Sequence, residues 1–342
     1  MVKRISLATM LTIFATVFTM MFFANGTMAE TKITWKAQAG MSTKSWSYKY
    51  QFKVFADRVN KNSGGRLEIK IFAPGTVVGA YEMFDAVRRN AIQVGMGVGG
   101  YNLKHVPEAG IEQGLPGTFD STFDAMNFIN FYKDGKVYDL INASYQEQGA
   151  YLLRSFGYSP QVIISKHPIK SVAEIKGLKI RASGELQALA KNLGASPVTL
   201  APSEVAMAIQ TGTIDGVIFP AYTIGTFKLW DVAKGLLGPS LGQTAGDIYI
   251  NLEEWKKLPD DLKWLVEEAA LYANGYYQSV IDKRIKEILK QAETEHGVTI
   301  VNMTPDDMQK VIKASKPIRE KLAKKSQRAA EIVKLAEEYI AE

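Results

Sequence analysis

Short segments with alternating apolar and polar positions follow one another along the first part of the chain, separated by segments with helical spacing. Residues 32–39 (KITWKAQA) and 66–75 (RLEIKIFAPG) alternate as strands do. Residues 48–65 repeat apolar positions at helical spacing and close on a glycine pair. A helix over 80–90 and a strand over 91–98 complete a β-α-β-α-β series, which favours a parallel sheet covered by helices.

The same order of elements returns further along. The segment 172–183 (VAEIKGLKIRAS) leads into a strand, and the helix ELQALAKNLG closes on Gly194, as helices often do. A strand at SPVTLA, a helix opened by Pro202 and a strand at TIDGVIFP follow. Two such units in one chain predict an α/β fold with two lobes that face a cleft.

The last third of the chain reads as helical. The stretch from 258 to 297 carries one helical pattern that is long for a globular protein, and Gly275 is its weakest point. Thr304, Pro305 and Asp307 form the start of a further helix with a capping box. We expect Pro317 to break or kink that helix.

Composition narrows the class of protein. The 342 residues leave room for two domains, and 46% of them are apolar, so we expect a packed core. The net charge of +6 comes from basic residues spread along the chain, without the arginine-aromatic pattern of RNA-binding proteins, so we expect no nucleic-acid partner. The chain has no cysteine, which excludes disulfides, thiolate catalysis, cysteine-based metal sites and a lipoprotein anchor.

The first residues resemble an export signal. Lys3 and Arg4 precede an apolar run over 5–24, and a small, polar segment ends at Ala29. This pattern predicts a signal peptide over 1–29 that is cleaved near Ala29 and a soluble mature protein in the periplasm. An uncleaved membrane anchor is the alternative, because the run approaches the length that spans a bilayer.

The stretch VGMGVGGYN (94–102) contains a G-x-G-x-x-G motif made by Gly95, Gly97 and Gly100. A dinucleotide site needs a helix that opens on the third glycine and an acidic strand end about 20 residues later. The residues after Gly100 show no helical apolar pattern, and Asp120 does not read as the end of a strand. We therefore interpret the glycines as places of close backbone approach, to a ligand or to the opposite lobe.

Other catalytic patterns are weak. His105, His167 and His296 lie far apart and lack the spacing of metal ligands. Paired acids such as Asp306 and Asp307 fall at helix starts, where carboxylates favour the helix dipole. The chain carries no metalloprotease, serine hydrolase or P-loop motif, and we predict that it is not an enzyme.

Residues 172–216 carry the strongest resemblance to a known family. The run VAEIKGLKIRASG followed by LAKNLGASPVTLAPSEVAMAIQTGTIDG resembles the extracytoplasmic solute receptors of tripartite ATP-independent periplasmic (TRAP) transporters. The segments FADRVNKNSGGRLEIKIFAPG and YINLEEWKKLPDDLKWLVEEAA are similar to that family as well. The resemblance implies a two-lobed receptor with a long helix spanning both lobes, which delivers a small organic acid to a membrane permease driven by an ion gradient.

In that family the arginine of the G-L-K-I-R strand clamps the ligand carboxylate, and here it is Arg181. A guanidinium suits this role because its planar fork meets a carboxylate in two parallel hydrogen bonds. The resemblance adds four further candidates. Gln161 and Tyr101 would give polar contacts, Phe219 would lie in the pocket, and Trp46 would form an apolar wall.

One departure from the family concerns metal. Receptors that bind their ligand together with a cation have a glutamate after the Asp-Gly pair, whereas Phe219 and its neighbours follow Gly216 here. A later acid is replaced by Gln243 and Thr244. A hard cation needs several oxygen ligands, so we predict no metal and no cofactor. The loss of these acids favours a monocarboxylate with a hydrophobic body, such as an aromatic or branched 2-oxo acid.

The family pattern also predicts where the lobes divide. Lobe I is expected over 30–158 with 247–286, and lobe II over 159–246 with 287–342. We expect a monomer whose partners are the ligand and the permease subunits. Two alternatives are a binding protein that serves a signalling partner and an enzyme that uses a nucleotide cofactor.

Overall fold

The computed structural model describes residues 32–113, 115–119, 121–154, 157–238 and 241–342, so the predicted leader lies outside the described residues. The chain divides after Ile33, and the fold belongs to the unit Thr34–Glu342. Its strands are β1 Ile33–Ala39, β2 Leu67–Phe72, β3 Val94–Gly97, β4 Ala150–Leu152, β5 Gly157–Ser165, β6 Lys179–Arg181, β7 Ser196–Val198, β8 Gly216–Pro220, β9 Gly235–Gly238, β10 Gln243–Asn251 and β11 Thr299–Asn302.

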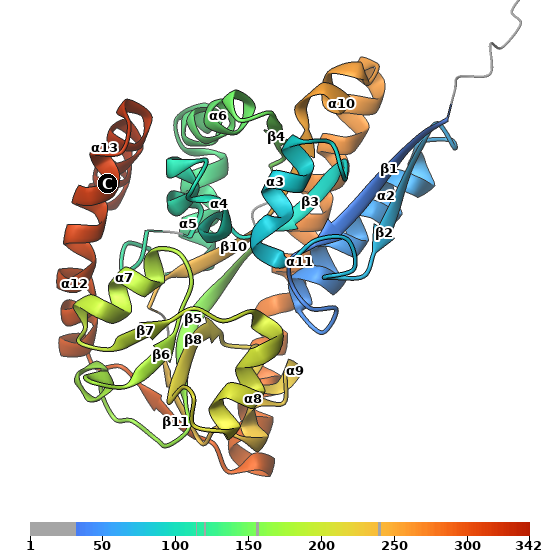
Figure 1. Ribbon diagram of the computed structural model, residues 1–342. Coiled ribbons are helices and arrows are strands. Elements are labelled where there is room, and N and C mark those ends of the chain that lie inside the picture. The colour runs from blue at the N-terminus through green and yellow to red at the C-terminus, as the bar shows by residue number, and fades with distance from the viewer. Residues whose placement is uncertain (1–31, 114, 120, 155–156, 239–240) are drawn as a thin grey trace, which may run out of the picture. The chain divides into compact units, whose positions relative to one another are not determined.

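Helices surround these strands (Figure 1). The α-helices are α2 Lys53–Asn62, α3 Met83–Arg88, α4 Gly99–Asn102, α5 Thr122–Asn130, α6 Tyr132–Glu147, α7 Glu185–Asn192, α8 Val205–Gln210, α9 Thr223–Thr226, α10 Leu252–Lys257, α11 Asp260–His296, α12 Pro305–Ala323 and α13 Gln327–Ala341. Shorter turns include the π-helical η1 Tyr48–Phe52 and the 3₁₀ helices η2 Ala80–Glu82, η3 Pro107–Gln113, η4 Val172–Ile175, η5 Pro202–Glu204 and η6 Leu229–Asp231. Within the described chain no helix has the length and apolar character needed to cross a bilayer.

The sheet is mixed and follows the order β2-β1-β3-β10-β5-β8-β6-β7. Parallel pairs join β1 to β3, β6 to both β7 and β8, and β9 to β11. Antiparallel pairs join β5 to β8 and β9. The predicted α/β class with parallel units is therefore confirmed.

One strand, β10, joins the two parts of the sheet. Its residues 247–250 pair with β3, whereas its residues 243–246 pair with β5. Figure 1 shows β10 running between the β1–β3 region and the β5–β8 region. We call β1–β4 the first half-sheet, and β5–β9 with β11 the second half-sheet. The predicted lobe boundaries stay a prediction.

Each half-sheet is covered by an apolar core. The first core contains Phe84, Tyr145 and Tyr249, whose rings meet edge to face or tilted. The second contains Ile163 and Leu237 on adjacent antiparallel strands. Val162 and Ile164, which alternate with Ile163 along β5, belong to a separate core, so both faces of this strand are covered.

Two helical predictions gave different results. The helix α11 is continuous through Gly275 and packs against α2, α9 and β11. The helix α12 begins with the predicted capping box at Thr304 and runs on through Pro317, so of the two expected effects, a break or a kink, the break does not occur. Pro317 has no N–H to donate to the carbonyl of Lys313. Both residues are exposed, so water can bind that carbonyl instead.

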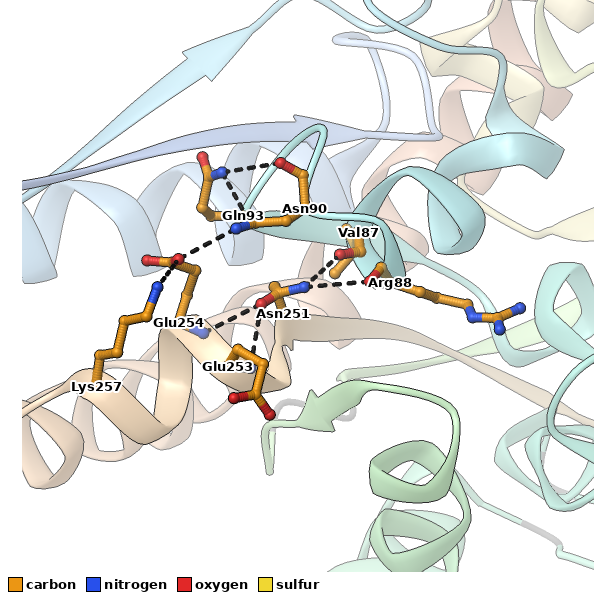
Figure 2. A network of polar contacts seen from close by, with 8 residues as sticks. All are labelled: Val87, Arg88, Asn90, Gln93, Asn251, Glu253, Glu254 and Lys257. Atoms are coloured by element: carbon orange, nitrogen blue, oxygen red, sulfur yellow. Dashed lines mark hydrogen bonds and ion pairs between the residues drawn. The ribbon is translucent and has the colours of Figure 1, made fainter.

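The first half-sheet is tied to α10 by one buried amide. Asn251 caps α10 because its Oδ1 accepts from the backbone N–H groups of Glu253 and Glu254, both at 3.1 Å. Its Nδ2 donates to the carbonyl oxygens of Val87 at 2.9 Å and of Arg88 at 3.4 Å, at the end of α3 (Figure 2). One side chain thereby fixes the end of β10 relative to both helices.

Candidate functional site

A cavity lies where β10 passes from the first half-sheet to the second. Its empty volume is about 610 Å³, including the space at its mouth that is open to solvent. Its lining comes from the loop after β1, from α4, from β5, β6, β8 and β10, and from α9 and α11. The lining residues are Met41, Ser45, Ser47, Val98, Tyr101, Ser159, Gln161, Arg181, Ser183, Pro202, Ile218, Phe219, Pro220, Tyr222, Thr223, Phe227, Thr244, Ala245, Gly246 and Tyr277.

Arg181 is the cation of this cavity. It ends β6 and is only 1% exposed, which makes it one of the largest buried side chains in the described chain. Its Nε donates to the carbonyl oxygen of Leu200 at 3.1 Å, and its guanidinium lies 5.0 Å from the ring centre of Phe219. Its Nη2 has no hydrogen-bond partner among the described residues, and no described acid forms an ion pair with it. A buried, unpaired guanidinium is costly, and an anion at Nη2 would remove most of that cost.

Three other predicted residues share the cavity with Arg181. The Tyr101 phenol is within hydrogen-bonding reach of Arg181; burial raises its pKa, although the positive charge of Arg181 acts in the opposite direction. Tyr101 is therefore a neutral donor at ordinary pH. Gln161 is 2% exposed and its Nε2 donates to the Ser159 carbonyl at 3.3 Å, while Phe219 faces the guanidinium.

Trp46, the fifth predicted residue, does not line the cavity. It is 7% exposed and stacks on Tyr222, with the ring centres 4.7 Å apart and the planes at 14°. Tyr222 lies on the wall of the cavity. Trp46 therefore supports the wall from behind.

A group of hydroxyls forms a second polar part of the lining. Ser45 Oγ lies 2.8 Å from Ser47 Oγ and 3.0 Å from the Tyr222 hydroxyl. Ser159 and Tyr277 are hydrogen-bonded to each other nearby in the lining. These groups both donate and accept, so they suit a neutral polar group of a ligand.

The sequence pattern did not single out these hydroxyls. Tyr222 lies two residues after the end of β8, and a polar side chain just after a strand end could have been predicted as a ligand contact. Tyr277 lies mid-way along α11, where no local pattern distinguishes a cavity residue from a core residue. Thr244 was noted only as a replacement for an acid, yet its Oγ1 is buried in the lining without a hydrogen-bond partner in the described chain.

The glycine motif has a packing role. None of its glycines is among the described residues of the lining. A Cβ on Gly95 would lie 2.6 Å from the Tyr249 ring, and one on Gly99 would lie 2.0 Å from the Ala109 carbonyl oxygen. A single helical turn, α4, does follow β3, which the sequence did not predict. A bulky residue at Gly99 would therefore collide with the backbone of η3.

The described lining contains no aspartate or glutamate. Nor do three or more His, Asp or Glu side chains gather in a metal-binding arrangement anywhere in the described part of the chain. The charged chemistry of the cavity is thus one permanent cation surrounded by hydroxyls and apolar side chains.

Comparison with known families gives a match over most of the chain. The model of "Bacterial extracellular solute-binding protein, family 7" matches residues 39–326. A curated relative from Escherichia coli, the 2,3-diketo-L-gulonate-binding periplasmic protein YiaO, is 26% identical over 253 residues, covering 73% of this chain and 75% of its own. The monocarboxylate 2-oxoacid-binding periplasmic protein all3028 of Nostoc is 25% identical over 293 residues, covering 80% and 75%.

Solved structures show the same fold. The Bordetella pertussis receptor DctP7, which binds pyroglutamic acid, superposes with a TM-score of 0.78 at 20% identity and covers 88% of this chain and 99% of its own. A TRAP solute-binding protein from Rhodoferax ferrireducens with bound malonate gives 0.79 at 21% identity, covering 90% and 98%.

Proposed function

Because this chain belongs to the bacterial extracellular solute-binding protein family 7, we propose that it is a periplasmic TRAP receptor whose ligand is a small monocarboxylate. The family is one of receptors, so the chain is not an enzyme. The observation that carries the proposal is the buried guanidinium of Arg181, which lines the cavity and whose Nη2 has no hydrogen-bond partner in the described chain. Arg181 is the clamp for the carboxylate.

The rest of the lining supports a ligand with one charge and an oxo or hydroxyl group. No described acid faces the cavity, so neither an ammonium group nor a second metal-bound carboxylate has a partner there. The Tyr101 phenol and the Thr244 hydroxyl, which has no partner among the described residues, can donate to an oxygen beside the carboxylate. Met41, Val98 and Phe227 contact an apolar body, which favours a branched or aromatic 2-oxo acid. The Nostoc relative, named for 2-oxo acids, is consistent with this choice.

Binding takes place between two lobes that close over the ligand. We place lobe I at 30–158 with 247–286 and lobe II at 159–246 with 287–342. Receptors of this kind deliver the ligand to membrane permease subunits, and the receptor acts as a monomer after its leader is removed.

The test is calorimetry and thermal unfolding with matched ligands. The panel pairs branched and aromatic 2-oxo acids with the corresponding 2-hydroxy acids, 2-amino acids and uncharged amides. Ligand at about a hundred times its Kd stabilises the folded protein by about 2.7 kcal/mol. We expect this shift with the 2-oxo acids and no shift with the amides.

Two substitutions assign the clamp. Arg181→Gln should abolish the ligand-dependent shift without lowering the stability of the free protein, because it removes an unpaired buried charge. Arg58→Gln is the matched control, since Arg58 pairs with Glu268 away from the cavity. A 2-oxo acid that still binds Arg181→Gln with full affinity would show that the carboxylate lies elsewhere.

A further inference from the structure

Two carboxyl groups lie buried against each other outside the cavity lining. Glu112, in η3, is 1% exposed, and Asp247, on β10, is fully buried. The two groups are within hydrogen-bonding reach of each other. Asp247 directly follows Gly246, which lines the cavity. No cation of the described chain forms an ion pair with either carboxyl.

Hydrogen-bond donors around this pair are too few for two ionised groups. Asn102 donates its two N–H bonds to the Tyr145 hydroxyl at 2.9 Å and to Asp247 Oδ2 at 3.2 Å. Tyr145 donates its single O–H to the same Asp247 oxygen at 3.0 Å. Neither oxygen of Glu112 nor the second oxygen of Asp247 accepts a hydrogen bond from an N–H or hydroxyl donor in the described chain. An ionised carboxylate only accepts, so the contact between the two acids needs a proton.

We propose that Glu112 and Asp247 share one proton and act as positioning residues that hold Tyr101 in the cavity. Glu112 carries the proton and donates it to Asp247, which stays ionised and accepts from Asn102 and Tyr145. Asn102 is the last residue of α4, and Tyr101 is its neighbour in the same turn. The role assigned to Tyr101 rests on the proposed function, whereas the shared proton does not.

The packing between α4 and η3 leaves no slack. A Cβ placed on Gly99, the first residue of α4, would lie 2.0 Å from the Ala109 carbonyl oxygen and 2.8 Å from Glu112 Oε2. Because α4 packs this closely on η3, we expect a shift of Glu112 to be transmitted to α4. The Tyr101 ring also lies against Tyr81, with the ring centres 4.5 Å apart, so its position depends on the placement of this turn.

Burial supports a protonated pair. It raises the pKa of Asp247 to about 6 and, with the neighbouring Asp247 charge, raises the pKa of Glu112 well above its ordinary value. These folded-state values lie above those of the unfolded chain, so ionisation is penalised in the folded state. The resulting stability is full at low pH and is lost as the pH rises through the raised values.

The other groups that face the pair do not ionise in that range. They are the phenols of Tyr101 on α4, Tyr145 on α6 and Tyr249 on β10, and burial raises the pKa of each. Phe84 on α3 contacts Tyr145 and Tyr249 and carries no charge. Loss of the shared proton to water would leave two carboxylates in contact. Linkage to one proton then allows ligand affinity to fall up to about tenfold for each pH unit.

The experiment compares the wild type with Glu112→Gln and Glu108→Gln. Glutamine at 112 can donate an amide N–H to Asp247 and does not titrate. Glu108 is a buried acid of the same η3 that accepts from Ser326, so Glu108→Gln is the matched control. The unfolding temperature of the ligand-free protein and the Kd for the tightest 2-oxo acid are measured between about pH 5 and pH 9. Infrared spectra at neutral pH report the C=O stretch of a protonated carboxyl.

We expect the wild type and Glu108→Gln to lose stability and affinity towards alkaline pH and to show the protonated carboxyl band. Glu112→Gln should follow the wild type up to about pH 6, where Asp247 still ionises, then lose less stability and affinity than the wild type at higher pH, and lack the band. If Glu112→Gln folds poorly, Asp247→Asn provides the same test, because its amide can donate to Glu112.

Three results would overturn the proposal. One is a pH profile for Glu112→Gln that equals that of the wild type. Another is a wild-type spectrum without the protonated carboxyl band. The third is a rise in unfolding temperature with sodium or calcium chloride that the substitution removes, which would place a cation between the acids. If no acid binds at all, the proposed function fails, while the unfolding and infrared measurements still decide whether the proton is shared.

Discussion

Replacing Asn251 with alanine removes the amide that joins β10 to α3 and α10 (Figure 2). The change deletes an N-cap that accepts from two backbone N–H groups, and loss of such a cap costs about 1 kcal/mol. It also deletes the 2.9 Å bond to the Val87 carbonyl, and a buried group left unpaired costs about 1–3 kcal/mol. Because Asn251 is 4% exposed, water does not readily replace it. We expect the free energy of unfolding to fall by about 2–4 kcal/mol.

Urea unfolding followed by tryptophan fluorescence and circular dichroism measures this loss. Trp255 on α10 stacks on Tyr151, with the ring centres 4.2 Å apart, so its emission reports on the region of the substitution. Asn251→Asp keeps the cap but replaces the donor by an acceptor, and should lose about the same as the unpaired carbonyl alone. Lys256→Ala, on the exposed side of α10, is the control and should cost less than about 0.5 kcal/mol. A loss below about 0.5 kcal/mol for Asn251→Ala would show that the network does not stabilise the fold.

Two further substitutions test glycines at the start of α4 and in the interior of α11. Gly99→Ala should reduce the yield of folded protein or lower its unfolding temperature strongly, because the new methyl group would collide with the Ala109 carbonyl; a fully stable variant would contradict this packing. Gly275→Ala should stabilise the protein by about 0.5–1 kcal/mol, since no atom lies within 4 Å of the added Cβ and the helix interior favours alanine. A destabilised Gly275→Ala variant would indicate that α11 needs flexibility at this point, and urea unfolding of both variants provides the measurement.

Local sequence patterns predicted most of the elements that surround the cavity. The alternation at 32–39 and 66–75 gave β1 and β2, and the segment ending in Arg181 gave β6, because both patterns depend on neighbours in the sequence. The turn α4 was missed since four residues are too few to show a helical period. Pro317 does not break α12, because the Lys313 carbonyl that loses its hydrogen bond lies on the exposed face, where water can bind it.

The candidate site was predictable in part. Arg181, Gln161, Tyr101 and Phe219 all line one cavity, as the family resemblance implied, and their roles in binding stay a prediction. Ser159 and Tyr277 could not be found in this way, because β5 and α11 bring them together from positions 118 residues apart. The pairing of β10 with both β3 and β5 also joins segments far apart in the sequence, so no local pattern predicts where the half-sheets join.

The continuous helix α11 has a mechanical consequence. Its 37 residues correspond to a rod of roughly 55 Å, at about 1.5 Å per residue. It packs on α2 beside the first half-sheet and on β11 in the second, so a rotation of one against the other must bend this rod. The energy stored in the bent helix would oppose this rotation and would be released when the two parts rotate back. The helix would bend most easily at Gly275, where no atom lies within 4 Å of an added Cβ and the helix interior is weakest. The energy needed to bend α11 would then reduce the net free energy of ligand binding.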